Sequence, residues 1–216
     1  MARPARFAIE DIRAKALEIV DQGGLGALTM RRLAADLGTG PMTIYNYVDD
    51  RLGLEELVVD AVADGLVLPE PGEDWLDDVN AIATALWTAV RRHPAAIPLI
   101  LTRRTSTPSS FRAADALVGA LRRGGFEGAQ LLAAFRAVTG FVMGIAQAEL
   151  AGPLTSGTGV LAAAGRIETL AGEDYPNLAA LAGIGSASKP GEDFAGGLAL
   201  VLAGLEAAAQ GSGSRP

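Results

Sequence analysis

One segment, residues 28–54, constrains the fold of this 216-residue chain more than any other. Thr29 can cap a helix that starts at the next residue, because its hydroxyl can accept a free amide proton of the first turn. Gly38 ends that helix after about two turns. Pro41 suits the first position of a second helix, which we expect to run to Val48, since its missing amide proton would be unpaired there. The pattern predicts two short helices around a tight glycine turn.

The second helix of this pair carries polar groups where a buried helix would carry aliphatic side chains. Its apolar anchors are Ile44 and Val48, and the rest of its surface presents hydroxyls and an amide, which bond phosphates and base edges. Two helices of this length joined by a short glycine turn match the helix-turn-helix, whose second helix enters the major groove of DNA. The alternative is a packed helical hairpin with tyrosines on its surface.

The same run resembles the N-terminal domain of the tetracycline repressor (TetR) family of bacterial transcription regulators. It reads LTMRRLAADLG from position 28, then IYNYV from position 44, then Arg51. Tyr47 replaces the histidine that is usual in the family, Val48 replaces phenylalanine and Arg51 replaces lysine. Tyrosine can still donate to a phosphate and arginine keeps the charge, so these departures bear on sequence preference rather than on DNA binding itself.

The pattern and the resemblance together predict the residues that contact DNA. Hydroxyls and a cation at the end of the second helix suit phosphates, whereas its start points into the groove. A short basic arm, MARPAR, precedes the first helix and could also reach DNA. We assign Tyr45, Tyr47 and Arg51 to phosphates, and Arg31, Pro41, Met42 and Asn46 to base edges. The full predicted DNA-binding set is Arg3, Arg6, Thr29, Arg31, Pro41, Met42, Thr43, Tyr45, Asn46, Tyr47 and Arg51.

Composition limits the chemistry of the chain. Cysteine is absent and His93 is the single histidine. The chain therefore has almost none of the residues that disulfides, thiolate metal sites and histidine-based catalysis require. We expect no metal, no cofactor and no enzymatic activity, and a cytoplasmic location. The apolar stretch 131–148 contains Arg136 and falls short of an uninterrupted membrane span of about 20 residues, which favours a buried helix and no membrane contact.

The charge of the chain is unusual for a DNA-binding protein. The net charge is −7, yet residues 1–53 hold seven basic and seven acidic side chains. All of the excess acidity therefore lies in the second part of the chain. Because the distribution of charge matters more than its sum, we expect modest non-specific affinity for DNA and a far side that repels it.

Glycine and proline clusters divide the chain into helices, and no alternating strand pattern appears. We expect an all-α protein: an N-terminal three-helix DNA-binding domain over residues 1–68, including a connector helix, a larger C-terminal helical bundle over 69–210, and a disordered tail over 211–216. The helices expected outside the pair are 9–22, 51–66, 74–92, 109–123, 128–151, a weak helix at 160–170, a helical turn or two at 177–182, and 192–209. Residues 95–101 contain Pro98 and are expected to be irregular, and 185–191 to be a linker.

Two of these helices carry small residues at helical spacing, among them Gly140, Gly144 and Gly204. Such faces let helix backbones approach closely, either within one chain or between chains. The family resemblance implies a homodimer, in which residues 134–151 and 193–209 pair with their symmetry mates in a four-helix bundle. A twofold dimer also explains how one small motif reads a palindromic double-stranded DNA operator.

Apolar side chains with a few hydroxyls in the second domain suit a ligand cavity between helices, although core packing is the alternative for any single residue. The predicted ligand-binding set is Trp87, Ile97, Leu101, Leu121, Phe135, Thr139 and Met143. Tetracycline-binding members of the family hold a magnesium–drug chelate with histidines, and this chain has only His93. The resemblance therefore implies an apolar small-molecule effector without specifying the drug.

These features predict a homodimeric, ligand-responsive transcriptional regulator that acts as a repressor. Two alternatives remain open. The chain could be a helical small-molecule carrier or enzyme that has kept the fold without binding DNA, for which the neutral first 53 residues are the best support. It could also be a regulator that responds to a protein partner.

Overall fold

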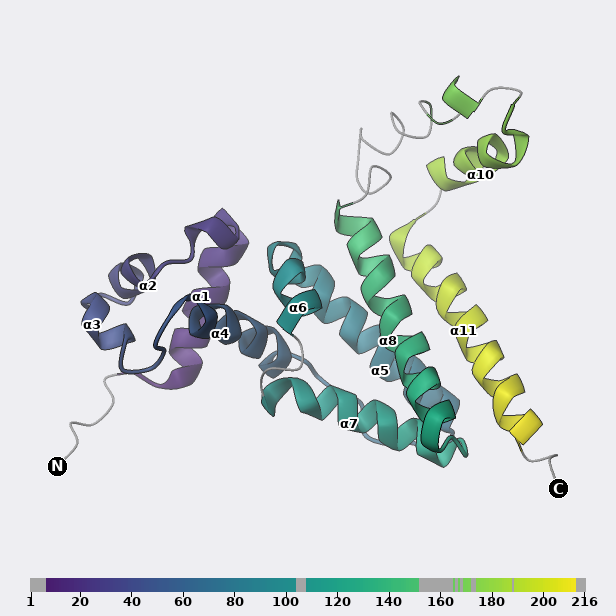
Figure 1. The fold of residues 1–216 in the computed structure, drawn as a ribbon, viewed down its shortest axis with the longest axis horizontal. Helices are drawn as coiled ribbons and strands as arrows, with labels where there is room; N and C mark the ends of the chain where they lie inside the picture. The colour runs from purple at the N-terminus through teal and green to yellow at the C-terminus, as the bar shows by residue number, and fades with distance from the viewer. Residues whose placement is uncertain are drawn as a thin grey trace. The chain divides into compact units, whose positions relative to one another are not determined.

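The computed structural model contains helices and no strand within the residues that it describes, which confirms the all-α prediction (Figure 1). The chain divides into two compact units. The first unit comprises Met1–Pro69 with Thr84–Ala116, and the second comprises Glu70–Ala83 with Leu117–Pro216. The described residues are 7–103, 108–151, 165, 167, 169–171, 174–187 and 189–212.

The first unit is built around two packed helices, α1 (Ile9–Gly23) and α4 (Arg51–Asp64). The face of α1 that the sequence predicts as apolar is buried, except that Ile9 is only half-buried. The buried side chains of α1 are Ile12, Ala16, Ile19 and Val20, and those of α4 include Leu54, Leu57, Val58 and Val62. The shorter elements η1 (Leu25–Ala27), α2 (Met30–Asp36) and α3 (Pro41–Ile44) lie between them in the sequence.

A charged contact accompanies the apolar packing of α1 on α4. Arg13 donates from its two terminal nitrogens to Asp60 at 2.7 Å and to Asp64 at 2.8 Å. Asp60 is 6% exposed, and a buried carboxylate of this kind is tolerated only when it is paired. The contact therefore fixes how the two helices are rotated against each other.

Residues 84–116 also belong to the first unit, although the sequence placed them in the second domain. They include the end of α5 (Trp75–Arg92), η2 (Pro94–Ala96), α6 (Ile97–Arg103) and the start of α7 (Pro108–Arg123). Helix α6 packs on α4 and η2 packs on α1. The expectation of an irregular segment at 95–101 is wrong, because Pro98 lies in the first turn of α6, where its missing amide proton costs no helix bond.

Two polar contacts reinforce this attachment of residues 84–116. Nδ1 of His93, the residue that precedes η2, lies 2.8 Å from a carboxylate oxygen of Asp21 in α1. Arg112 in α7 donates to the carbonyl oxygen of Ala63 at the end of α4, at 3.2 Å. Both α1 and α4 are thus linked to residues 84–116 by polar contacts.

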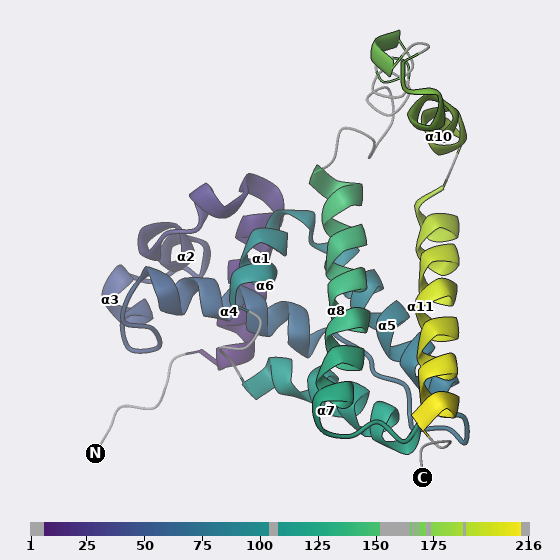
Figure 2. The same cartoon turned by 45° about the vertical axis from the view of Figure 1, so that its right-hand side comes forward.

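The second unit is organised by α8 (Gly128–Ala151) and α11 (Pro190–Ser212), which run side by side (Figures 1 and 2). The rings of Phe141 and Phe194 lie 5.7 Å apart between them. Gly197 allows this approach, because a Cβ atom there would fall 2.6 Å from the Phe141 ring. The predicted bounds of α8 are confirmed to the residue.

The end of the chain differs from the sequence prediction in three places. Helix α10 (Pro176–Ser186) is longer than the expected turn or two, and α11 begins at Pro190, which leaves little of the expected linker. Gly211 and Ser212 continue α11 rather than starting a tail. The weak helix predicted over 160–170 lies largely outside the described residues, as do positions 213–216 of the predicted tail.

A compact corner joins the start of α5 to the end of α7 in the second unit. Gly125 has φ +86° and Phe126 donates its amide to the carbonyl of Leu121, the arrangement of a Schellman helix end. This places Phe126 against Trp75, with ring centroids 5.7 Å apart. Asp78, also buried, accepts from the amide of Gly72 and pairs with Arg123.

The two long helices of the second unit expose much of their apolar surface. Within the described residues, Gly128–Ala148 and Pro190–Gly211 are long and apolar enough to cross a membrane by length and composition, yet only 28% and 17% of these segments are buried. The prediction of a buried helix over 131–148 is therefore wrong for the single chain. One face, with Val138, Val142 and Ala146, is buried, and the opposite face is exposed.

We expect Gly124→Ala to lower the free energy of unfolding by about 1–3 kcal/mol, because overpacking against a rigid ring forces the structure to shift. A Cβ atom at this position would lie 2.6 Å from the Trp75 ring. The control is Gly119→Ala, inside α7 with open space around it, where alanine should be neutral or stabilise the helix. Urea denaturation compares the two, and equal midpoints would contradict this account of the corner.

Candidate DNA-binding site

The turn between α2 and α3 has the geometry that the sequence predicts. The hydroxyl of Thr29 accepts the amide of Arg32 at 3.1 Å, which confirms Thr29 as the N-cap of α2. At the other end Gly38 has φ +64°, and Thr39 donates its amide to the carbonyl of Ala34 at 2.8 Å. This Schellman arrangement needs glycine at its left-handed position, so the turn is set by local chemistry.

The recognition segment, residues 41–48, begins with α3 and continues as turns. Ile44 is fully buried and Val48 is 9% exposed, so both predicted anchors are confirmed. The helix ends at Ile44 rather than at Val48. The reason is the junction with α4: Asp50 caps α4 by accepting the amide of Gly53 at 3.0 Å, and a Cβ atom on Gly53 would lie 2.9 Å from that of Val48. The chain must leave the helix to make this close approach.

Several residues of the predicted DNA-binding set are exposed on the recognition segment and on α2. Met42 is 75% exposed and Tyr45 is 46% exposed, which is unusual for side chains of their size. Pro41, Asn46 and Arg31 are also exposed. A surface that combines an amide, a hydroxyl and an apolar side chain can read base edges and thymine methyl groups.

Other predicted DNA-contacting side chains are already engaged within the unit. The hydroxyls of Thr39 and Thr43 lie 2.9 Å apart and bond across the turn. The hydroxyl of Tyr47 bonds both backbone groups of Phe7. Arg3 and Arg6 lie outside the described residues.

Arg51 has a structural role that the sequence analysis missed. Its guanidinium donates to the carbonyl oxygens of Leu28 at 2.6 Å and Leu25 at 2.8 Å, and to Glu55 at 3.0 Å. These bonds brace the loop before α2 against the start of α4. Three of its five N–H groups are used in this way, so two remain for a phosphate. The carbonyl partners lie 23 and 26 residues earlier, so local spacing gives no signal of the contact.

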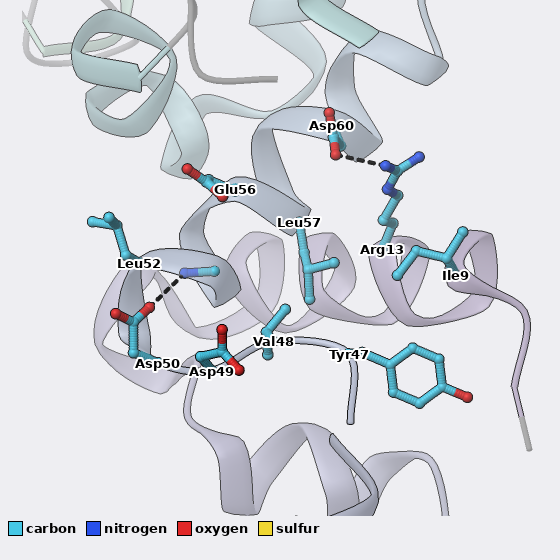
Figure 3. Close-up of a pocket in the computed structure, with 11 residues that line it drawn as sticks. Ile9, Arg13, Tyr47, Val48, Asp49, Asp50, Leu52, Glu56, Leu57 and Asp60 are labelled. Carbon is cyan, nitrogen blue, oxygen red and sulfur yellow. Dashed lines mark hydrogen bonds and ion pairs between the residues drawn. The ribbon is translucent and has the colours of Figure 1, made fainter. Parts of the chain in front are cut away.

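A pocket of about 350 Å³ lies among α1, the recognition segment and α4 (Figure 3). Its lining includes four carboxylates and a single guanidinium, that of Arg13. Such a balance repels phosphate, so this side of the unit is unsuited to contact with the DNA backbone. The carboxylates are Asp49, Asp50, Glu56 and Asp60.

The predicted ligand-binding residues are divided between the two units. Trp87, Ile97 and Leu101 belong to the first, and the other four belong to the second. Leu121 is fully buried, and the hydroxyl of Thr139 donates to the carbonyl of Phe135 in its own helix at 2.8 Å. That these residues face one cavity stays a prediction. Among the described residues, no group of three or more His, Cys, Asp or Glu side chains could hold a metal ion.

A capped glycine turn, a short exposed recognition segment and a second helical unit define the class of helix-turn-helix regulators with a separate helical domain. Comparison with known proteins agrees. A family model described as "Tetracyclin repressor-like, C-terminal domain" matches residues 68–209. This chain belongs to the tetracycline repressor (TetR) family.

Two curated relatives are named as regulators. An HTH-type transcriptional regulator of Saccharopolyspora erythraea is 33% identical over 141 residues, which cover 65% of this chain and 60% of that protein. The HTH-type transcriptional repressor DrrR1 of Streptomyces coeruleorubidus is 30% identical over 155 residues, which cover 68% of this chain and 57% of DrrR1. The chain thus spans less than two thirds of either relative. Both are named for transcription control and not for catalysis.

A solved structure extends the similarity over nearly the whole chain. ActR, a TetR family protein of Streptomyces coelicolor crystallised in complex with (S)-DNPA, is 29% identical with a TM-score of 0.80. The match covers 95% of this chain and 100% of the ActR chain. ActR has also been crystallised in complex with actinorhodin.

Two substitutions separate the bracing role of Arg51 from the predicted phosphate contact. We expect Arg51→Ala to lower the free energy of unfolding by about 1 kcal/mol, through the lost backbone bonds, and to reduce the salt slope of DNA binding by about 0.9, the value of one phosphate. Arg51→Lys keeps the positive charge but lacks the guanidinium that donates to both carbonyls. It should therefore restore the salt slope of DNA binding but not the free energy of unfolding. If Arg51→Ala leaves the salt slope of DNA binding unchanged, Arg51 contacts no phosphate and has the bracing role alone.

Proposed function

We propose that this protein is a ligand-responsive transcriptional repressor that binds a palindromic DNA operator as a homodimer in the cytoplasm. The observation that carries the proposal is the exposed recognition segment: Met42, Tyr45 and Asn46 face solvent next to a turn whose conformation is fixed by Gly38. Membership of the TetR family, and relatives named as regulators and repressors, support it.

Selection from a pool of random-sequence DNA duplexes tests this function. We expect enrichment of a palindrome, because a twofold dimer presents two identical recognition segments about one helical turn apart, roughly 34–36 Å. The neutral N-terminal residues favour the competing proposal, a small-molecule-binding protein or enzyme that no longer binds DNA. A pool that stays random after selection would support that alternative.

The exposed faces of α8 and α11 support the homodimer. They present small side chains at helical spacing, and at Gly140, Gly144 and Gly204 an added Cβ atom would meet nothing within 4 Å in the single chain. Leu200 is 78% exposed. Arg136 lies on the exposed side of α8, and a charge there is costly in lipid. A second copy of the chain therefore suits these faces better than a membrane does.

We expect Gly144→Arg to convert the protein from a dimer to a monomer, because it introduces a long charged side chain into a close helix contact. Light scattering coupled to size exclusion measures the mass directly. The control, Gly26→Arg, places the same side chain on an exposed glycine of the first unit with open space around it and should stay dimeric. A monomeric parent, or a Gly144→Arg variant that remains a stable dimer, would refute this placement of the interface.

We propose that the effector is an apolar small molecule held by the predicted ligand-binding set. ActR, the similar protein of known structure, was crystallised with (S)-DNPA and with actinorhodin. Three of the predicted ligand residues lie in residues 84–116, which are packed on α1 and α4 through His93 and Arg112. A ligand that shifts this segment acts directly on the helices that support the recognition segment.

Ligand should therefore weaken the affinity for DNA, and DNA should weaken the affinity for ligand by the same factor, because thermodynamic coupling is reciprocal. Tryptophan fluorescence measures the affinity for actinorhodin, and for a panel of other aromatic compounds, with and without the selected duplex. We expect Trp87→Ala to weaken the response to effector more than it weakens DNA binding. If Trp87→Ala loses DNA binding yet responds normally to effector, Trp87 is a core residue and the site lies elsewhere.

A further inference from the structure

Helical geometry turns two side chains of the recognition segment away from the core. Ile44 and Val48, four positions apart, are buried. The backbone stays close to helical around them, because the amides of Tyr45 and Val48 donate to the carbonyls four residues earlier, at 3.2 and 3.1 Å. Met42 and Asn46 are also four positions apart and are exposed, on the side opposite the two anchors. They therefore point toward whatever docks on this segment.

The exposed side chains of the recognition segment carry no charge. Residues 41–48 read PMTIYNYV and contain no Lys, Arg, Asp or Glu. The hydroxyls of Thr43 and Tyr47 are half-buried and already bonded within the first unit. The exposed remainder consists of an amide, a phenol and two apolar side chains, which are Asn46, Tyr45, Met42 and Pro41.

Uncharged side chains of this kind match A·T pairs rather than G·C pairs in the major groove. Guanine presents two acceptors that Arg or Lys complements, and cytosine presents a donor that Asp or Glu complements. The segment has none of these side chains. Adenine presents an acceptor next to a donor, which the amide of Asn46 complements, and thymine presents a methyl group that an apolar side chain contacts. Met42 is 75% exposed, so it has the free surface for that contact.

Of the three arginines that flank the segment most closely in sequence, two are engaged within the first unit. Arg32 donates to Asp36 at 2.8 Å within α2, and Arg51 donates to two backbone carbonyls and a carboxylate. The third, Arg31, is exposed in the first turn of α2. It lies on a different helix from Met42, so a guanine that it reads lies beside the base pairs that the recognition segment covers.

We propose that the recognition segment reads adjacent A·T pairs in each half-site, and that Met42 is the residue that contacts a thymine methyl group. The proposal rests on the DNA-binding function proposed above and names the bases that this function selects. Asn46 adds an adenine. The phenol of Tyr45, which the sequence assigns to a phosphate, adds no base preference. Guanine in the half-site is confined to the position that Arg31 reads.

Removing one thymine methyl group at a time tests this reading. Thymine is replaced by uracil at single positions of the duplex selected by the parent, which deletes the methyl group in the major groove and leaves the base pair and the phosphates unchanged. In the parent, uracil at the contacted thymine should weaken binding about fourfold, the value of one buried methyl-sized group. In Met42→Ala the same uracil should have no further effect, because the side chain that covers the methyl group has been removed.

Val67→Ala is the control for the loss of an exposed apolar side chain. Val67 is 84% exposed in the first unit, but it follows the end of α4 and lies outside the recognition segment. This variant should keep the fourfold penalty of the parent at the same thymine. If Met42→Ala shows that penalty as well, Met42 does not contact the methyl group and the proposal is overturned.

The bases of the selected duplex separate failure of this proposal from failure of the proposed function. A palindrome with adjacent A·T pairs and a uracil-sensitive thymine in each half-site supports both. A palindrome with G·C pairs at most of its specified positions, or one in which uracil has no effect at any thymine, overturns the A·T reading and leaves the DNA-binding function standing. A pool that stays random overturns the DNA-binding function and, with it, the A·T reading.

Discussion

The packing of α1 on α4 is the interaction on which the rest of the first unit depends. Aliphatic side chains of both helices are fully buried along this contact, and the pairing of Arg13 with the buried Asp60 sets their relative rotation. Removing one partner of such a pair would leave an uncompensated charge in the interior, which costs more than the pair itself contributes. The recognition segment has only Ile44 and Val48 as buried anchors, so its orientation derives from the two helices that flank it in sequence.

Helix α4 connects the DNA-reading elements to the rest of the chain. At its start, Arg51 braces the loop before α2, and Gly53 allows close contact with Val48. At its end, the carbonyl of Ala63 accepts a bond from Arg112 in α7. A helix that is fixed at both ends transmits a displacement rather than absorbing it. In the proposed mechanism, ligand binding displaces residues 84–116, α4 moves with them, and the separation of the two recognition segments in the dimer changes.

Local chemistry predicted most of the fold. The cap at Thr29, the turn at Gly38 and the full extent of α8 follow from residues that act on their immediate neighbours, so the sequence alone specifies them. Pro98 was misread because proline breaks a helix only in its interior and not in its first turn. The exposure of α8 was missed because an apolar sequence does not reveal whether its own chain or a second copy covers it.

The sequence predicted which side chains the recognition segment exposes, but not the contacts that others make within the first unit. The exposed Met42, Tyr45 and Asn46 are where the sequence places them on the recognition segment. Arg51 and Tyr47 depart from the residues that are usual in the family, and their partners lie 23 to 40 residues away in sequence. Such contacts depend on tertiary structure, so they appear only once α1 and α4 are packed together. Two residues that looked like direct DNA contacts thereby gain roles in positioning.

The central claim is that the recognition segment reads DNA sequence, and Asn46 tests it most directly. Asn46 is exposed at a position expected to face base edges, where asparagine can form a bidentate contact with adenine that is worth about 1–3 kcal/mol of discrimination. Selection from random-sequence duplexes, run in parallel with the parent and with Asn46→Ala, measures that preference. We predict that the variant loses base preference at one position in each half-site while the rest of the palindrome is unchanged. An identical consensus for both proteins would contradict the account.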